Sequence, residues 1–190
     1  MNKQQPGAKY WQYGWTGFYS LSSAGQLLLA LDSNDEDDQL YWGVGAVKAS
    51  GKLAKLLLKP SPAVGSADSF QALPAGNREE RLRKLSQGET LLETNAQRAG
   101  ERFTWKRHAM GIAGNLLGGV VIAAFGDSSD AVISTLLGLA VGETTIWTEP
   151  ADATRDLEDY RNKRWTRQAA HAGQWRVLAS PGGATLHIRF

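Results

Sequence analysis

The chain contains no cysteine, which excludes disulfide bonds, thiolate metal sites and cysteine nucleophiles. Basic side chains are also missing from one long internal stretch, because residues 109–150 contain four acids but no Lys or Arg. Lysine and arginine normally belong to water-facing surfaces. A stretch of this length without them therefore favours burial, either inside the protein or in lipid.

Familiar catalytic and cofactor motifs are absent as well. The sequence has no serine-nucleophile motif, no phosphate-binding glycine loop followed by Lys-Ser or Lys-Thr, and no dinucleotide-binding fingerprint. His108, His171 and His187 lack the mutual spacing of a metal site. We therefore expect no cofactor and assign no catalytic residue.

What the sequence does contain is a repeated pattern. Residues 24–28 read AGQLL and residues 113–117 read AGNLL. Each begins an apolar run that passes an acidic turn, enters a second apolar run and stops at a proline, Pro60 or Pro150. Two units of nearly equal length on one plan predict two helical hairpins packed as a four-helix unit.

The remaining segments predict further elements around this unit. Residues 1–10 are expected to be a loose arm and residues 60–76 a loop. Asn77 and Glu80 have the spacing of a capping box and open a charged amphipathic helix to about residue 103, which Gly88 weakens. A charged helix is expected over 151–170. The tail alternates in polarity around PGG at 181–183, which predicts a β-hairpin.

The predicted fold class is therefore mainly α, with two pseudo-repeated helical hairpins, a connecting amphipathic helix and a C-terminal β-hairpin. We treat 1–190 as a single domain. Its parts are the first hairpin at 11–60, the loop and amphipathic helix at 61–106, the second hairpin at 107–150, and the charged helix and β-hairpin at 151–190.

Membrane association has arguments on both sides. Residues 11–31 and 109–125 carry no charge, aromatic residues gather near the segment ends, and Gly114 and Gly118 are four apart, as in close helix packing. Against this, the segment 39–58 carries lysines, and each charge near a bilayer centre costs roughly 2.5–3.5 kcal/mol. A soluble, glycine-rich helical bundle is the competing interpretation.

Four polar residues within the apolar helices are the structural or functional candidates. Glu143 has no basic neighbour in sequence, and we hypothesise that it pairs with Lys48 across the bundle; the alternative is that it faces water near a helix end. Gln26 and Asn115 occupy matching places in the repeat. Amides in apolar helices usually bond to another helix, so a mutual contact is the hypothesis here.

The acidic turn at 32–38 has side chains with oxygen ligand atoms at alternate positions, as a calcium-binding loop has. These are Asp32, Asn34, Glu36 and Asp38. However, the glycine and the terminal glutamate of an EF-hand loop are missing. A solvated helix start is the favoured interpretation, and no metal site is assigned.

These patterns favour a non-catalytic, membrane- or envelope-associated helical protein that packs against lipid or a partner subunit. The partner subunit can be a second copy of the same chain, as in a homo-oligomer. The alternative is a soluble helical module with an apolar pocket for a lipid-like ligand. The least favoured function is an enzyme that uses Glu143, with His108, as acid and base. Nucleic acid is not an expected partner, because the basic run at 161–167 is diluted by nearby acids and the net charge is only +2.

Overall fold

The computed structural model describes residues 5–162, 174–180 and 183–189. The chain is mainly helical, as predicted. Its elements in chain order are α1 (Gln5–Asp32), α2 (Glu36–Leu58), η1 (Pro62–Val64), α3 (Ser66–Ala72), α4 (Arg78–Gly100), η2 (Glu101–Phe103), α5 (Trp105–Phe125), α6 (Ser128–Thr148), α7 (Asp152–Arg161), β1 (Gln174–Ser180) and β2 (Gly183–Arg189).

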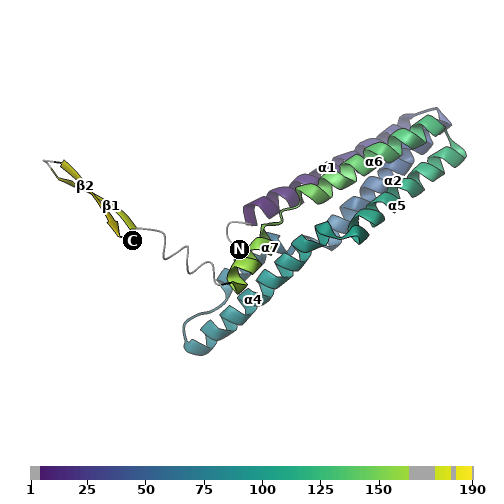
Figure 1. Ribbon diagram of the computed structural model, residues 1–190. Coiled ribbons are helices and arrows are strands. Elements are labelled where there is room, and N and C mark those ends of the chain that lie inside the picture. Colours follow the sequence, from purple (N-terminus) through teal and green to yellow (C-terminus); the bar gives the residue numbers. More distant parts are fainter. Residues whose placement is uncertain (1–4, 163–173, 181–182, 190) are drawn as a thin grey trace.

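Four long helices form the bundle predicted from the repeat. Helices α1 and α2 make one hairpin, α5 and α6 make the other, and both hairpin turns lie at the same end (Figure 1). Gly126 in the second turn faces Asp37 and Leu40 at the start of α2, which places the two turns side by side. The helical bundle is thus confirmed, and the acidic residues of both turns gather at one end.

Local capping explains where these helices begin. The Asp35 side chain accepts from the backbone N–H groups of Asp37 and Asp38, so the acidic turn starts α2 at Glu36 rather than at residue 39. Asp127 starts α6 in the same way. Asn77 and Glu80 form the predicted capping box of α4. Each cap satisfies backbone donors that a helix start leaves without partners.

Two local expectations were wrong. Helix α1 already begins at Gln5, because Gln5 donates to the carbonyl of Val64 and Ala8 is buried. The segment expected as a loop at 60–76 contains α3, whose Phe70 packs on Gly88 of α4. A Cβ at Gly88 would lie 2.7 Å from the Phe70 ring. The glycine that was expected to weaken α4 therefore provides the space for this contact.

Aromatic side chains of α1 join the two hairpins. The indole nitrogen of Trp11 donates to the Thr145 carbonyl at 3.1 Å. Trp15 donates to the Thr148 hydroxyl at 3.1 Å, and the Tyr19 hydroxyl lies 2.7 Å from that of Thr145. Three polar contacts from large, otherwise apolar side chains thereby connect α1 to the C-terminal end of α6.

Small residues occupy several buried positions of the bundle, beside the larger Trp11, Tyr19 and Leu56, and many large apolar residues lie on its outside. Ala46, Ala49, Ala131 and Gly142 are buried, and Ile122 is the largest side chain that is completely enclosed. The outer faces of α5 and α6 carry exposed Leu116, Leu117, Val120, Phe125, Val132, Ile133, Leu136 and Leu137. Two helices, α5 and the helical segment that begins at Ser128, are long and apolar enough to cross a membrane, and 22% of each apolar stretch is buried.

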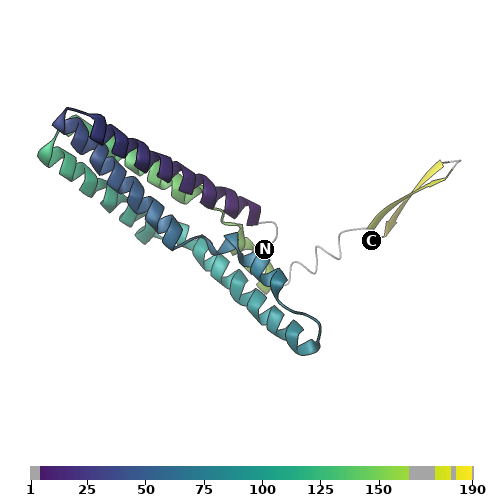
Figure 2. The same cartoon turned by 180° about the vertical axis from the view of Figure 1, so that it is seen from behind.

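Helices α4 and α7 pack together beyond the end of the bundle opposite the turns (Figure 2). Ala96 and Ala99 of α4 meet Ala153 and Leu157 of α7. The predicted charged helix is described as far as Asn162, and the rest of the segment 151–170 lies outside the described residues.

The two strands pair antiparallel, from Gln174 with Arg189 to Ser180 with Gly183. Part of the predicted PGG turn lies outside the described residues. That this hairpin belongs to the domain and covers a face of the bundle stays a prediction.

Candidate functional site

Lys48 projects from the middle of α2 into the bundle. Its ammonium group donates to the Ser134 hydroxyl at 2.9 Å and to the Ser134 carbonyl at 3.0 Å. Two glycines make room for this long side chain, because a Cβ at Gly118 would lie 2.7 Å from Lys48 Cδ and one at Gly138 would lie 3.1 Å from Nζ. Gly118, which the sequence suggested for helix packing, and Gly138 thus accommodate a charged side chain.

The two repeat-related amides each face a glycine of their own hairpin. A Cβ at Gly45 on α2 would lie 1.8 Å from Gln26 Oε1, and a Cβ at Gly138 on α6 would lie 2.0 Å from Asn115 Oδ1. Asn115 also donates to the Gly111 carbonyl at 2.9 Å. The hypothesised hydrogen bond between Gln26 and Asn115 is not formed among the described residues. The two repeated hairpins therefore share one structural feature, an amide side chain that fills the space left by a glycine of the same hairpin.

Glu143 pairs with His108 rather than with Lys48. Its Oε2 lies 2.8 Å from His108 Nδ1 and accepts from the Trp147 indole at 3.2 Å. His108 Nε2 lies 2.8 Å from the Arg102 carbonyl. Because both partners of the ring are acceptors, a doubly protonated imidazole can donate to both. The hypothesised pair of Lys48 with Glu143 is wrong, and the lysine that Glu143 attracts electrostatically is Lys52, one helical turn further on.

An arginine cluster at the basic end of the bundle surrounds a buried carboxylate. Glu149 is 2% exposed and forms ion pairs with Arg98 and Arg107, while Arg102 donates to the Glu149 carbonyl at 2.6 Å. This cluster joins α4 and α5 to the C-terminal end of α6. This cluster was not predicted from the sequence, although Glu149 directly before Pro150 at the end of an uncharged run is a signal that could have indicated it.

Two cavities lie beside these side chains. One, of about 230 Å³, is lined by Gln26, Asn115 and Ser134 together with aromatic residues of α1 and α2. The other, of about 340 Å³, lies between α2, α5 and α6 and is lined by Lys48, Lys52, Lys55, Arg98 and Arg107. The bundle therefore contains a cavity lined by basic residues next to an apolar core cluster around Trp11, Tyr19 and Leu56, whereas its outer face is apolar.

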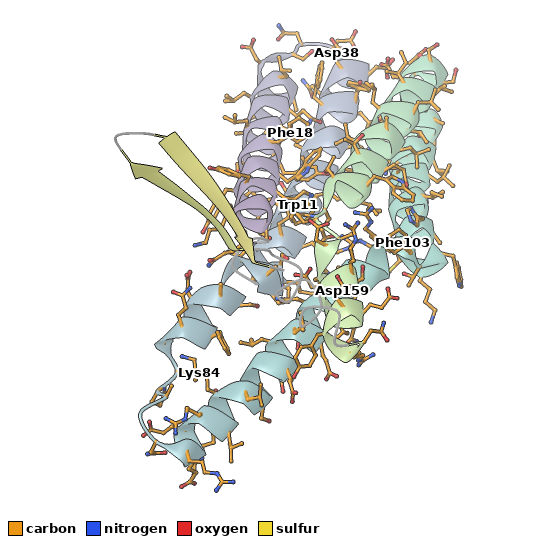
Figure 3. All side chains as sticks on the ribbon, turned by 60° about the vertical axis from the view of Figure 1, so that its left-hand side comes forward. Trp11, Phe18, Asp38, Lys84, Phe103 and Asp159 are labelled. Atoms are coloured by element: carbon orange, nitrogen blue, oxygen red, sulfur yellow. The ribbon has the colours of Figure 1, made fainter. Side chains whose placement is uncertain are left out.

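The acidic turn behaves as a helix start in the part of the chain that the structure describes. Asp38 is labelled at the turn end of the bundle in Figure 3, and Trp11 lies toward the other end. Within the described residues, no three His, Asp or Glu side chains gather as metal ligands would. Asp35, which lies within the turn between Asp32 and Asp38, caps α2.

Comparison of the chain with models of protein families, with curated proteins and with solved structures finds no match. The class that the fold and the cavities define is a four-helix bundle with an apolar outer face and an internal cavity lined by basic residues.

Proposed function

We propose that this chain is a non-catalytic, membrane-embedded helical bundle whose outer face packs against lipid. The supporting observation is the reversed distribution of polarity in the second hairpin. Leu117 and Phe125 of α5 are 68% and 77% exposed, whereas Asn115 and Ser134 are 4% and 7% exposed. In water such an arrangement leaves a large apolar surface uncovered. In a bilayer the same surface meets hydrocarbon.

Helix lengths agree with this proposal. At 1.5 Å per residue, the 21 residues of α5 and of α6 each extend over about 31 Å, close to the roughly 30 Å hydrocarbon core of a bilayer. A helix in the core of a soluble protein is mostly buried, but only 22% of each of these apolar stretches is buried.

The charges at the two ends indicate how the bundle is oriented in the proposed membrane. The turn end carries the acids of both hairpin turns, including Asp35 and Asp127. The opposite end carries the basic residues Lys59, Arg98, Arg102, Lys106 and Arg107. Lysine and arginine flanking membrane helices favour the cytoplasmic side. We therefore place α4 and α7 on the cytoplasmic side and both acidic turns on the other.

The lysines of α2 were the main argument against a membrane, and for Lys48, though not for the exposed Lys55, the position weakens that argument. Lys48 points into the bundle and bonds to Ser134 instead of facing lipid. Charged residues inside membrane segments almost always face the bundle interior, pair with polar groups and mark functional sites.

A soluble module with a lipid-like ligand is the second candidate, and one observation favours it. The cavity of about 230 Å³ has a mainly apolar lining that includes Phe18, Tyr41 and Trp42, as the binding site of a small apolar ligand has.

Fractionation of cells that express the full chain separates the two. An embedded bundle stays in the membrane pellet after alkaline carbonate washing and is released by a nonionic detergent. A chain that is monodisperse in detergent-free buffer, with a small apolar molecule retained in native mass spectrometry, would overturn the membrane proposal and support the module.

A further inference from the structure

The cavity between α2, α5 and α6 holds more positive charge than its surroundings compensate. Five basic side chains line it: Lys48, Lys52, Lys55, Arg98 and Arg107. Three carboxylates act on this group. Glu149 is shared by Arg98 and Arg107, Glu101 also pairs with Arg98, and Glu143 attracts Lys52 but is bonded to His108. Two positive charges are thus uncompensated by the described residues.

Two of the lysines have no partner of their own. Among residues 5–162, neither the Lys52 nor the Lys55 ammonium group takes part in a hydrogen bond or an ion pair. Lys55 is an exposed side chain near Arg107, Lys52 and Arg98, which repel its charge, and near Glu149, which attracts it. Like charges gathered beside a cavity raise the energy of the empty protein, and an anion in that cavity lowers it.

Arg107 gives a second, independent indication. Its side chain is 10% exposed, and its Nη1 is buried without a hydrogen-bond partner among the described residues. Leaving a buried donor unsatisfied costs about 1–3 kcal/mol, and more for a charged group. An oxyanion in the cavity that Arg107 lines supplies the missing acceptor after a small movement of the guanidinium group.

The other residues that line the cavity indicate which kind of chemical group is attached to the anion. Trp11, Leu56, Met110 and Ile146 provide apolar walls next to the cations. Gly51, Gly111 and Gly114, on the facing sides of α2 and α5, also line the cavity, and a Cβ at each would meet open space. The cavity of about 340 Å³ is therefore open between these two helices and falls within the size range of ligand sites, roughly 300–1,000 Å³.

We infer that this cavity binds a phosphate group, held by Lys52, Lys55 and Arg107. A guanidinium group presents paired donors that match phosphate oxygens, and lysine adds point charges to them. A phosphate monoester carries up to two negative charges, in line with the uncompensated charge of the cavity. The apolar walls and the opening between α2 and α5 accept a chain attached to that phosphate, so an amphiphilic phosphate ester is the expected ligand.

The test is thermal unfolding of the purified full-length chain in nonionic detergent, with two arms. The first compares micelles containing dioleoyl phosphatidic acid with micelles containing dioleoylglycerol, which has the same chains but no phosphate. The second compares sodium phosphate with sodium chloride at equal ionic strength. At about ten times the dissociation constant, phosphatidic acid is expected to raise the midpoint by roughly 3–6 °C over dioleoylglycerol.

A rise with phosphatidic acid alone identifies a lipid phosphate as the ligand, and a rise in both arms shows that phosphate itself suffices. Unchanged midpoints in both arms overturn the inference. The test does not depend on membrane embedding, because the measurement applies equally to a chain that proves soluble without detergent.

Substitutions test whether the ligand-induced rise in the unfolding midpoint comes from binding at this cavity. The double substitution Lys52→Gln with Lys55→Gln removes two repelling charges, so its ligand-free midpoint is expected to equal or exceed that of the wild type. Its ligand-induced shift is expected to fall below about a third of the wild-type shift. Lys59→Gln, an exposed residue at the end of the same helix, is the matched control and keeps the whole shift. A double variant that keeps the whole shift also overturns the inference.

Discussion

Lys48 of α2 reaches across the bundle and donates to both the hydroxyl and the carbonyl of Ser134 on α6, at 2.9 and 3.0 Å. Ser134 is 7% exposed, so this contact holds an ammonium group inside the bundle. Because large apolar side chains occupy the outer face at the same level, the chain directs its charge inward and its apolar surface outward. The predictions below test what each part of this arrangement contributes.

The first prediction concerns the cost of enclosing Lys48. Lys48→Met keeps the length of the side chain and removes the charge, and replacing an enclosed charge by an apolar group of similar volume is often stabilising. We expect the free energy of unfolding to rise by about 1 kcal/mol, measured by denaturant unfolding in detergent. Lys59→Met, at an exposed position on the same helix, serves as the control and should change it little. A loss of stability in Lys48→Met would show that the Ser134 contact outweighs desolvation.

The second prediction concerns the amide that fills the space at Gly138. In Gly138→Ala the new Cβ would lie 2.0 Å from Asn115 Oδ1, and Asn115 is 4% exposed with little freedom to move. Overpacking of this kind costs about 1–3 kcal/mol. Asn115→Ala in the same chain should restore most of the loss, as a double-mutant cycle measures. Gly43→Ala, where no atom lies within 4 Å, should instead stabilise by about 0.5–1 kcal/mol.

Much of the fold could be predicted because its signals are local. The duplicated AGQLL and AGNLL segments, the acids before α2 and α6, and the Asn77–Glu80 pair each act within a few residues, and the helices they indicate are present. The expectations at 1–10 and 60–76 failed because long-range contacts decide these segments. Gln5 is held by Val64 and Phe70 by Gly88, and neither partner can be identified from local sequence.

The candidate site was predicted only in part, and for a geometric reason. Lys48, Glu143, Gln26 and Asn115 were chosen as polar groups within apolar helices, but their partners depend on how far each helix is shifted along its neighbour. One helical turn, about 5.4 Å, separates the expected partner of Glu143, Lys48, from the lysine it attracts, Lys52. The cluster around Glu149 joins segments about 40–50 residues apart and has no signature in a single sequence.

The third prediction compares two carboxylates at the basic end. Glu149 is 2% exposed and forms ion pairs with two arginines, so Glu149→Gln leaves Arg107 uncompensated and Arg98 with Glu101 alone, and it should cost about 3–5 kcal/mol. Glu143 is 35% exposed and pairs with His108, so Glu143→Gln should cost at most about 1 kcal/mol. Thermal unfolding of both variants measures the difference. Equal losses would contradict the assignment of Glu149 as the structural centre of this end.

The fourth prediction concerns pH. The backbone N–H of Asp130, together with the hydroxyl and backbone N–H of Ser129, holds the pKa of Asp127 below its ordinary value of 3.8. A carboxyl group with a lowered folded-state pKa stabilises the protein above its unfolded-state pKa, and this contribution disappears as the pH falls through the folded-state pKa. Asp127→Asn keeps a capping side chain that does not titrate. Its midpoint should therefore fall less steeply below pH 3.8 than that of the wild type, as parallel thermal melts measure.

The fifth prediction places a charge on the outer face of the bundle. Leu117 lies near the middle of α5 and is 68% exposed, so Leu117→Asp meets either hydrocarbon or water. In a bilayer the carboxylate costs roughly 2.5–3.5 kcal/mol. The ratio of chain that resists carbonate extraction to chain that is released should therefore fall about 100-fold. Leu82→Asp, at an exposed position of α4 outside the proposed membrane region, should leave that fraction unchanged. If Leu117→Asp instead improves solubility without changing extraction, the outer face meets water, and the soluble module becomes the better account of this chain.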